Sequence, residues 1–246
     1  GGWLALAGII VLGPRIGRFA PDGTPRLIAG HNLTLVTLGG FILWLAWFGF
    51  NAGSTLTSSG NLGKIMLNTH LAGVSAVTAY LLISGVMRKA ILLSDTVNIS
   101  LAGLVAITAG CATMSPVYAI VTGVGACLAY LAVKRLLDNV QMDDAVYAVA
   151  VHVGGGVWGT LAAGLFYEGD LFSTHRIIVQ MMGIGAMFVW SFGLGMVVYF
   201  VIEKTIGLRV LAQHEQRGLD FTEHAEGAYP EFQDSLFSQQ TLTERH

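Results

Sequence analysis

Residues 177–202 read IIVQMMGIGAMFVWSFGLGMVVYFVI, and none of these side chains carries a charge. A helix of about 20 apolar residues is long enough to cross the hydrocarbon core of a bilayer. An uncharged run of this length does not suit the surface of a water-soluble protein. The sequence therefore predicts an integral membrane protein.

Composition extends this prediction to the whole chain. Hydrophobic residues make up 54% of the 246 residues and charged residues 11%, whereas about 25% of an ordinary soluble domain is charged. Lipid leaves only helices or closed barrels as spanning structures, and the chain has no alternating strand pattern. We therefore predict an all-α, polytopic transmembrane helix bundle. The apolar runs place a partial span at 1–13 and full spans at about 33–54, 65–87, 97–113, 115–133, 145–167 and 177–202.

These spans define a transmembrane domain at 1–206, and a polar tail follows at 207–246. The tail has too few apolar residues to form a separate folded domain. The run at 1–13 starts without Met and without a charged segment before it, unlike a signal peptide. We expect it to be the end of a helix that begins upstream, so that the chain is a fragment.

Lysine and arginine residues are distributed unevenly between the two sides of the predicted spans. Cytoplasmic loops are enriched in these residues. We therefore expect the first, third and fifth connections to be cytoplasmic, together with the C-terminus. These segments carry eleven cationic residues, Arg15, Arg18, Arg26, Arg88, Lys89, Lys134, Arg135, Lys204, Arg209, Arg217 and Arg245, whereas the opposite side carries two, Lys64 and Arg176.

Several classes of function find no support in the residue pattern. The net charge of −2 gives no indication of a nucleic-acid partner. Cys111 and Cys127 have neither disulfide nor metal-ligand spacing and suit small core positions. No phosphate-binding glycine loop or nucleophile–base motif is present. We expect no enzyme activity, metal or cofactor, but a compact bundle whose 32 glycines let helices approach closely.

His152 is the strongest candidate for a functional residue. No charged residue flanks it between 145 and 167, and it lies about two helical turns after Asp144. An ionisable residue within a membrane span is costly and is a functional candidate by default. Neutral imidazole both donates and accepts a hydrogen bond near pH 7. The remaining histidines outside the tail are expected at span ends or in connections, as interfacial polar residues: His31, His70 and His175.

The span at 33–54 ends in an aromatic segment that contains Trp47, Phe50 and Ser54. Aromatic residues are common at membrane interfaces, which is one explanation of this segment. Alternatively, the rings hold a cation by cation–π contact while the Ser54 hydroxyl accepts a hydrogen bond from it. The residues alone leave both explanations open. Asn68 and Asn98 lie near span ends, where we expect them to form hydrogen bonds between helices.

Several of these segments resemble the Amt/Mep/Rh ammonium transporter family in order and spacing. They are His31-Asn32-Leu33, Trp47-Phe48-Gly49-Phe50-Asn51-Ala52-Gly53-Ser54, Asn68-Thr69, residues 101–111 and Val151-His152-Val153-Gly154. The tail resembles that of the Amt branch from Gly207-Leu208-Arg209-Val210 through Gly218-Leu219-Asp220 to residues 224–229. The resemblance covers about residues 1–230, as the C-terminal half of the family's fold.

The resemblance implies an eleven-helix protomer in a homotrimer, with one pore in each protomer and two sets of five helices in an inverted repeat. This chain would hold the end of the fifth helix and all of the sixth to eleventh. His152 then matches the second of two pore histidines. Phe50 matches a gate phenylalanine, Trp47 a pore-lining tryptophan and Ser54 the hydroxyl of an outer ammonium site. The first pore histidine is expected about three residues before Gly1, so this half should not conduct by itself.

The resemblance also implies a function. Ammonium binds at the aromatic site, loses a proton and crosses as ammonia through a histidine-lined pore, because a bare charge in a dry pore is costly. The alternative is an ammonium sensor of the same fold that is coupled to a signalling module. Either protein would be a multi-pass protein of a plasma or inner membrane.

The tail of the family contacts neighbouring subunits and a PII-type regulatory protein. The resemblance assigns this role here to the region of Gly207, Arg209, Gly218 and Asp220. The sequence departs from the family at Tyr147, where an acidic residue is common five positions before the pore histidine. Residues 231–246 also extend beyond the matched tail. Both departures concern regulation more than conduction.

Overall fold

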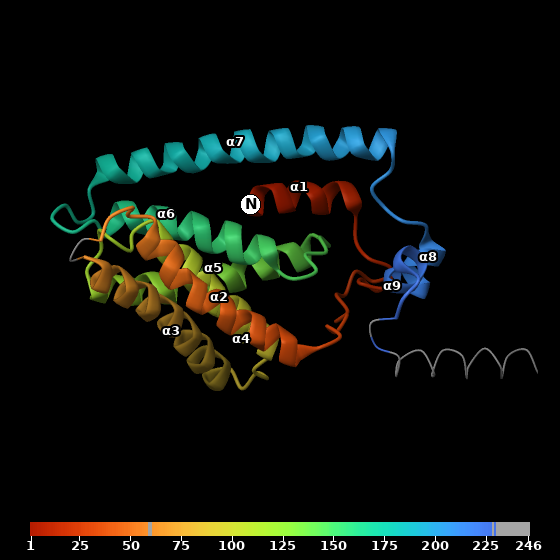
Figure 1. The fold of residues 1–246 in the computed structure, drawn as a ribbon, viewed down its shortest axis with the longest axis horizontal. Coiled ribbons are helices and arrows are strands. Elements are labelled where there is room, and N and C mark those ends of the chain that lie inside the picture. Colours follow the sequence, from red (N-terminus) through yellow and green to blue (C-terminus); the bar gives the residue numbers. More distant parts are fainter. Residues whose placement is uncertain (59–60, 228, 230–246) are drawn as a thin grey trace, which may run out of the picture. The chain divides into compact units, whose positions relative to one another are not determined.

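The computed structural model describes residues 1–58, 61–227 and 229. The chain divides into two compact units, Gly1–Val201 and Ile202–His246, which we describe separately. The first unit is a bundle of helices (Figure 1), and no β-strand forms among the described residues. The all-α fold class predicted from the sequence is therefore confirmed. Residues 231–246 of the predicted tail lie outside the described residues.

Each predicted apolar run contains a helix. Among the described residues, four helices are long and apolar enough to cross a membrane, namely α2, α3, α5 and α7. The others are shorter than 18 residues, although η1 and α6 form one continuous helical run. The bounds are α1 Gly2–Leu12, α2 Leu33–Gly53, α3 Leu62–Val86, α4 Leu93–Thr108, α5 Pro116–Asn139, η1 (a π-helical turn) Ala150–Gly154, α6 Gly155–Leu165, α7 Thr174–Thr205, α8 Ala212–Arg217 and α9 Leu219–His224.

The start of α4 differs from the prediction. We expected a span at 97–113, but α4 begins four residues earlier, at Leu93, and includes Asp95 in its first turn. Asp95 is buried and accepts hydrogen bonds from Lys134 Nζ of α5, at 2.6 and 2.8 Å, and from the Tyr130 hydroxyl, at 2.8 Å. A buried carboxylate is tolerated when it is paired and hydrogen-bonded. The pairing therefore places Asp95 inside the helix rather than in a connection.

The end of α4 also differs, because the helix stops at Thr108 rather than near residue 113. Residues just beyond it form turns, and Asn68 of α3 donates from Nδ2 to the carbonyl oxygens of Cys111 and Met114, at 2.9 Å each. Carbonyl groups outside a helix need such partners in a buried place. A side chain from another helix therefore allows the chain to leave α4 early.

Helix α5 is longer than the predicted span at 115–133. It begins at Pro116, whose missing N–H is no loss in the first helical turn, and continues to Asn139. Lys134 and Arg135, which we placed in a connection, lie on this helix. Lys134 enters the helix because Asp95 balances its charge and the Tyr147 ring lies 4.3 Å from its ammonium group.

Glycines form the closest helix contacts in the bundle. A Cβ atom at Gly103 of α4 would lie 2.6 Å from the carbonyl oxygen of Ala72 in α3, and one at Gly155 of α6 would lie 2.9 Å from that of Ala102 in α4. A Cβ atom at Gly159 would overlap the carbonyl oxygen of Ala106. Close backbone approach of this kind requires residues without a side chain. Gly155 contacts Ala102 and Gly159 contacts Ala106, so residue numbers increase in the same direction along both helices. Helices α4 and α6 therefore run in parallel.

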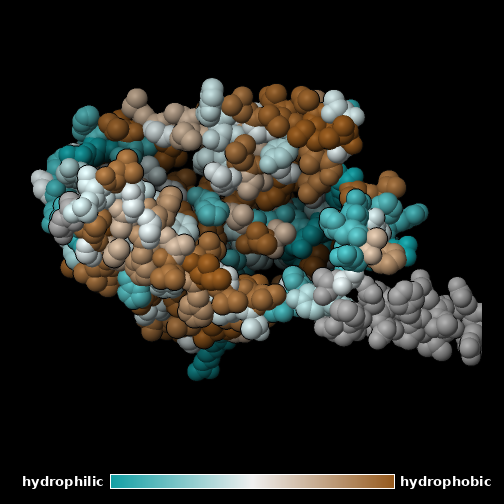
Figure 2. All heavy atoms as spheres, viewed as in Figure 1, coloured by the Kyte–Doolittle hydropathy of each residue, from teal (hydrophilic) through white to brown (hydrophobic). Residues whose placement is uncertain are grey.

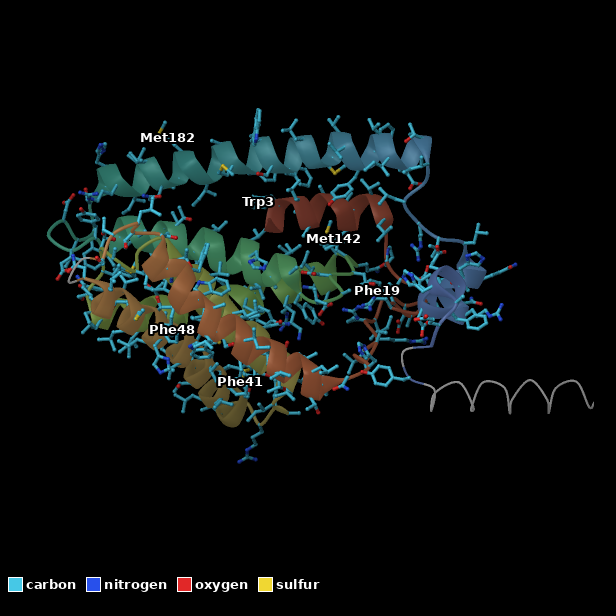
Figure 3. All side chains as sticks on the ribbon, in the orientation of Figure 1. Trp3, Phe19, Phe41, Phe48, Met142 and Met182 are labelled. Atoms are coloured by element: carbon cyan, nitrogen blue, oxygen red, sulfur yellow. The ribbon has the colours of Figure 1, made fainter. Side chains whose placement is uncertain are left out.

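Helix α7 lies along α1 at the edge of the first unit (Figure 1). A Cβ atom at Gly195 would lie 3.1 Å from Cβ of Ala7, and the Trp3 ring meets the Phe188 ring edge-on with a centroid distance of 4.9 Å. Trp3 is labelled beside these helices in Figure 3. Most of the remaining α7 surface is exposed and hydrophobic, as the brown residues of Figure 2 show. Such a surface suits lipid or another helix.

An ion-pair network joins the connection after α1 to the end of α5 and the connection that follows it. The Arg15 guanidinium donates to Asp143 at 2.6 and 2.9 Å, while Arg18 donates to Asp143 at 3.2 Å and to Asp138 at 2.5 Å. Burial favours the neutral form of Asp143, but the hydrogen bonds from Arg15 and the two guanidinium charges lower its pKa overall. The Asp143 carboxylate therefore stays ionised and fixes the segment that leads to His152.

Candidate functional site

The aromatic end of α2, which comprises Trp47, Phe50 and Ser54, is attached to α4 through a hydrogen bond. Trp47 Nε1 donates to the Thr108 hydroxyl at 2.9 Å, and that hydroxyl donates to the carbonyl oxygen of Leu104 at 2.8 Å. The threonine oxygen therefore acts as an acceptor for the indole, which fixes the rotation of the Trp47 ring. The Trp47 and Phe50 rings meet edge-on with a centroid distance of 5.8 Å.

A second hydrogen bond of the same kind attaches this end of α2 to α3. Asn51 Nδ2 donates to the Thr69 hydroxyl at 2.9 Å, and that hydroxyl donates to the carbonyl oxygen of Ile65 at 2.7 Å. Asn51 and Thr69 are both buried, and Asn51 Oδ1 has no hydrogen-bond partner among the described residues. Sequence reasoning did not select Asn51, Thr69 or Thr108. The sequence offered one indication for Asn51, which lies between the site candidates Phe50 and Ser54. Thr69 and Thr108 were named only as parts of the segments that resemble the family.

The remaining residues of the aromatic end are accessible. The Phe50 side chain is 57% exposed. Ser54 follows the last turn of α2, and its hydroxyl donates to the carbonyl oxygen of Phe50 at 2.6 Å. With its proton used in this way, the Ser54 oxygen is free to accept a hydrogen bond from a cation such as ammonium.

His152 lies in the π-helical turn η1, at the start of the α6 helix. Single π-helical turns within α-helices are often found at functional sites. The side chain is exposed, and the backbone of α1 approaches it, since a Cβ atom at Gly2 would lie 3.0 Å from the His152 Cβ. The structure thus places His152 on a surface of the bundle rather than in its buried core.

Asp144 fixes the beginning of the His152 helix. Its carboxylate accepts hydrogen bonds from the backbone N–H groups of Ala148 at 2.8 Å, Val149 at 2.7 Å and Ala150 at 3.4 Å. These are the N–H groups that a helix start leaves without partners. Burial raises the pKa of Asp144 although these N–H groups oppose the shift. The helix therefore starts after Asp144, with its first helical residue at Ala148 rather than at the predicted 145.

Helix α4 contacts both the aromatic end of α2 and the helix that carries His152, so their positions can be compared along it. Trp47 bonds to α4 at Thr108, while Gly155 packs on α4 at Ala102. His152 precedes Gly155 by three residues in a helix parallel to α4, which places it level with about residue 99. With a rise of 1.5 Å per residue, Trp47 and His152 are separated by roughly 13 Å along α4. The predicted site residues therefore divide into two locations at different depths.

The two asparagines that we expected between helices differ in their partners, since those of Asn98 include Tyr130 of α5 whereas those of Asn68 lie in a turn. Asn68 binds the turn after α4, as described above, and Asn98 Nδ2 donates to the Val146 carbonyl oxygen at 3.2 Å and to the Tyr130 hydroxyl at 3.4 Å. His70 was expected near a span end, but it lies eight residues inside α3. The Trp44 and Phe48 rings lie 5.7 and 6.1 Å from its imidazole, so that aromatic neighbours accommodate it there.

The tail residues that we singled out lie in the second unit. Gly207 and Gly218 adopt positive φ angles of 78° and 100°, which glycine alone tolerates readily. The Arg209 guanidinium pairs with Glu215, with a shortest distance of 2.9 Å. Asp220 lies in the first turn of α9, where a negative charge is favourable. These residues shape the tail between α7 and α9.

A comparison with known protein families identifies the family of this chain. A model of the family described as "Ammonium Transporter Family" matches residues 1–229, which is nearly all of the described chain. The chain belongs to the ammonium transporter family. This is a family of transporters rather than enzymes, and the chain is an integral membrane protein, as its apolar helices indicated.

Individual ammonium transporters support the same assignment. The chain is 39% identical to ammonium transporter Amt2 of Archaeoglobus fulgidus over 248 residues, which is 94% of this chain and 53% of that protein. It is 36% identical to ammonium transporter Amt2 of Methanocaldococcus jannaschii, over 94% of this chain and 54% of that protein. The chain therefore spans about half the length of the curated relatives it matches.

Solved structures confirm that the fold is that of the Amt and Mep proteins. A structure described as a sensor Amt protein is 41% identical and matches with a TM-score of 0.86 over 90% of this chain and 56% of that one. Mep2 of Candida albicans is 24% identical and shares the fold, with a TM-score of 0.76 over 85% of this chain and 50% of that one. The ammonium transporter fold predicted from sequence is thus confirmed.

The hydrogen bond from Asn51 to Thr69 leads to a first prediction. Replacing Thr69 by valine keeps the side-chain shape but leaves the Asn51 amide group without its acceptor in a buried place. Such a loss costs about 1–3 kcal/mol, and α2 should rotate to relieve it. In the full-length protein, we expect the KM for the ammonium uptake proposed below to rise several-fold (about fivefold or more for 1 kcal/mol). Thr69→Ser retains the hydroxyl and should restore the parent KM; if both variants behave alike, Thr69 does not position Phe50.

Proposed function

We propose that this chain forms part of an ammonium conduction pathway in which the aromatic end of α2 receives ammonium and His152 lines the inner path of ammonia. The observation that carries the proposal is the separation of these two locations along α4. The first is formed by aromatic rings and a hydroxyl oxygen that can accept a hydrogen bond, and the second is formed by an imidazole. A cation is attracted by ring faces and by an acceptor oxygen. An imidazole in an apolar setting suits a neutral species that both donates and accepts hydrogen bonds.

The chemistry follows from the cost of charge in an apolar pore. Ammonium at Trp47, Phe50 and Ser54 gives up a proton to water at this accessible end of α2 before it enters, because an unpaired charge in an apolar medium is strongly disfavoured. Ammonia then passes Phe50 and reaches His152, which exchanges hydrogen bonds with it and takes part in relaying the proton. Potassium has no proton to lose, so the same pathway rejects it.

Flux measurements test this proposal directly. The full-length protein that contains this chain, reconstituted in liposomes, should give an ammonium-dependent current or an internal pH change, with no comparable response to potassium at equal concentration. Equal responses to both ions would contradict deprotonation as the basis of selectivity. No response to either ion, combined with saturable ammonium binding, would favour the second candidate function.

That second candidate is ammonium sensing. The specific observation in its favour is the match to a sensor Amt protein at 41% identity and a TM-score of 0.86. A sensor would bind ammonium at the aromatic end of α2 and pass a conformational change to a signalling partner. Binding without flux separates this function from transport.

Assembly and orientation are part of the proposal. We propose a homotrimer in a plasma or inner membrane, with the tail in the cytoplasm and available to a PII-type regulatory protein. Light scattering of the purified protein tests the trimer, because a mass other than three protomers would contradict it. Labelling of a single cysteine placed in the tail, from one side of sealed vesicles, tests the orientation.

A further inference from the structure

Tyr147 lies directly before the helix that carries His152, and its backbone has an unfavourable conformation. Its φ angle is 56°, in the left-handed region that residues other than glycine, asparagine and aspartate rarely adopt. A bulky residue persists in this region only where the surrounding structure holds it there. The connection that leads to Tyr147 contains Met142, which is labelled in Figure 3. Contacts from other parts of the bundle therefore have to fix the Tyr147 conformation.

The backbone of Tyr147 contributes to the start of the His152 helix. Its carbonyl oxygen accepts a hydrogen bond from the N–H of Val151 at 2.9 Å. The N–H groups of the three residues before Val151 are bound by the Asp144 carboxylate. The π-helical turn Ala150–Gly154 begins within this stretch. The direction of the Tyr147 carbonyl group therefore sets how this turn starts, and His152 follows Val151 directly.

The Tyr147 ring is held by side chains of α5. The Lys134 ammonium lies 4.3 Å from the ring centroid, within the roughly 6 Å over which a ring face attracts a cation. The Tyr130 ring meets it edge-on, with a centroid distance of 6.2 Å. The Tyr147 hydroxyl forms no hydrogen bond with any of the described residues. The ring, rather than the hydroxyl, is therefore the part of Tyr147 that α5 contacts.

Asp95 of α4 fixes both of these α5 side chains. Its carboxylate accepts hydrogen bonds from the Lys134 ammonium and from the Tyr130 hydroxyl. Asp95 and Tyr130 are buried. A buried ion pair adds little net stability, because apolar residues of similar volume often stabilise a core equally well. This cluster of Asp95, Tyr130 and Lys134 therefore calls for an explanation other than stability, and it converges on the Tyr147 ring.

We infer that Tyr147 is a positioning residue for His152. Asp95 holds Lys134 on the Tyr147 ring, and the carbonyl group of Tyr147 sets the start of the π-helical turn. A displaced imidazole exchanges hydrogen bonds with ammonia less well, because these bonds weaken steeply with poor geometry. The consequence for transport rests on the proposed function of His152. The dependence of the π-helical turn on the Tyr147 ring does not, since it can be measured without flux.

Amide hydrogen exchange of the full-length protein that contains this chain, in detergent, tests the structural part. Tyr147→Asn keeps a residue that tolerates the left-handed region but removes the ring. Exchange of the amides of residues 148–154 should rise about tenfold, the equivalent of one cation–π contact and one edge-on ring pair. Tyr147→Phe retains the ring and should match the parent within about twofold.

Phe172→Asn is the matched control for Tyr147→Asn. Phe172 is another aromatic residue with a positive φ angle, 57°, and its ring contacts Tyr118 and Phe166 rather than α5 beside Tyr147. This variant should leave exchange at residues 148–154 unchanged. Unchanged exchange in Tyr147→Asn, or an equal rise in Phe172→Asn, would overturn the inference.

A remote double variant tests whether the α4–α5 cluster acts through Tyr147. Lys134→Met combined with Asp95→Asn removes the cation without leaving an unpaired charge, and it should raise exchange at residues 148–154 about fivefold. Lys134→Arg keeps a cation over the ring and should match the parent. Adding the double change to Tyr147→Asn should cause no further rise, whereas independent effects would multiply. Multiplied effects would show that the cluster does not act through the Tyr147 ring.

Ammonium flux in proteoliposomes of the same protein tests the transport part. Tyr147→Asn should lower the maximal rate about fivefold or more, because a misplaced group acts far less well on its substrate. The KM should stay within about twofold, and Tyr147→Phe should match the parent in both. Normal flux in Tyr147→Asn would overturn the positioning role in transport if His152→Ala loses flux. If His152→Ala also conducts normally, the proposed function of His152 fails, and raised exchange in Tyr147→Asn still supports the structural part.

Discussion

His152→Ala is expected to reduce ammonium flux at least tenfold and to remove its selectivity over potassium. The imidazole lies on an exposed face of a π-helical turn within an apolar segment. Its loss leaves ammonia without a group that both donates and accepts a hydrogen bond, and water entering the vacated space would lower the barrier for potassium. Flux and reversal potentials in proteoliposomes of the full-length protein that contains this chain measure both effects.

His70→Ala is the matched control for this variant. His70 also lies inside a helix of the membrane domain, but it contacts Trp44 and Phe48 rather than the His152 segment. We expect its flux to stay within about twofold of the parent protein. The proposed role of His152 would be wrong if His152→Ala conducted normally and selectively, or if both alanine variants lost flux equally.

Gly159→Ala is expected to have the largest effect on folding. A methyl group at this position would overlap the carbonyl oxygen and Cα atom of Ala106, so α4 and α6 have to separate. Overpacking of this kind costs about 1–3 kcal/mol, which corresponds to a decrease in Tm of several degrees for a domain of this size (about 2–4 °C per kcal/mol). Thermal unfolding of the purified protein in detergent, followed by fluorescence, measures the change.

Gly156→Ala provides a comparison within the same helix. A Cβ atom there meets only Val105 Cγ1 at 3.8 Å, which is an ordinary van der Waals distance. Alanine also favours a helix over glycine by about 1 kcal/mol, so this variant should be as stable as the parent or more stable. Equal Tm values for the two variants would show that the α4–α6 contact does not limit stability.

The fold could be predicted from the sequence because lipid restricts what an apolar run can form. Every predicted run contains a helix, and α2 agrees with its predicted bounds within one residue. Helices α4 and α5 extend beyond the predicted spans at Asp95 and Lys134, because these two residues, 39 positions apart in sequence, form an ion pair inside the bundle. A single sequence shows two charges there, but not that they neutralise each other.

The candidate site could be predicted only in part. His152 stood out because an ionisable residue in an apolar run is rare, whereas the π-helical turn around it has no sequence signal that we recognised. Thr69 and Thr108 were missed because a threonine within an apolar helix usually bonds to its own backbone. Both do so, yet their oxygens also accept hydrogen bonds from Asn51 and Trp47. Their roles in positioning α2 and their roles in transport stay predictions.

Helix α4 contacts Trp47 of α2 at one level and the helix of His152 at another. This arrangement limits where a bound ion can lie. The two locations lie roughly 13 Å apart along one helix, farther than any molecule as small as ammonium reaches. An ion at the Trp47 end of α2 therefore has to move along α4 to come level with His152. In the proposed pathway, each transfer therefore includes an interval in which ammonium or ammonia has left the first location and has not reached the second.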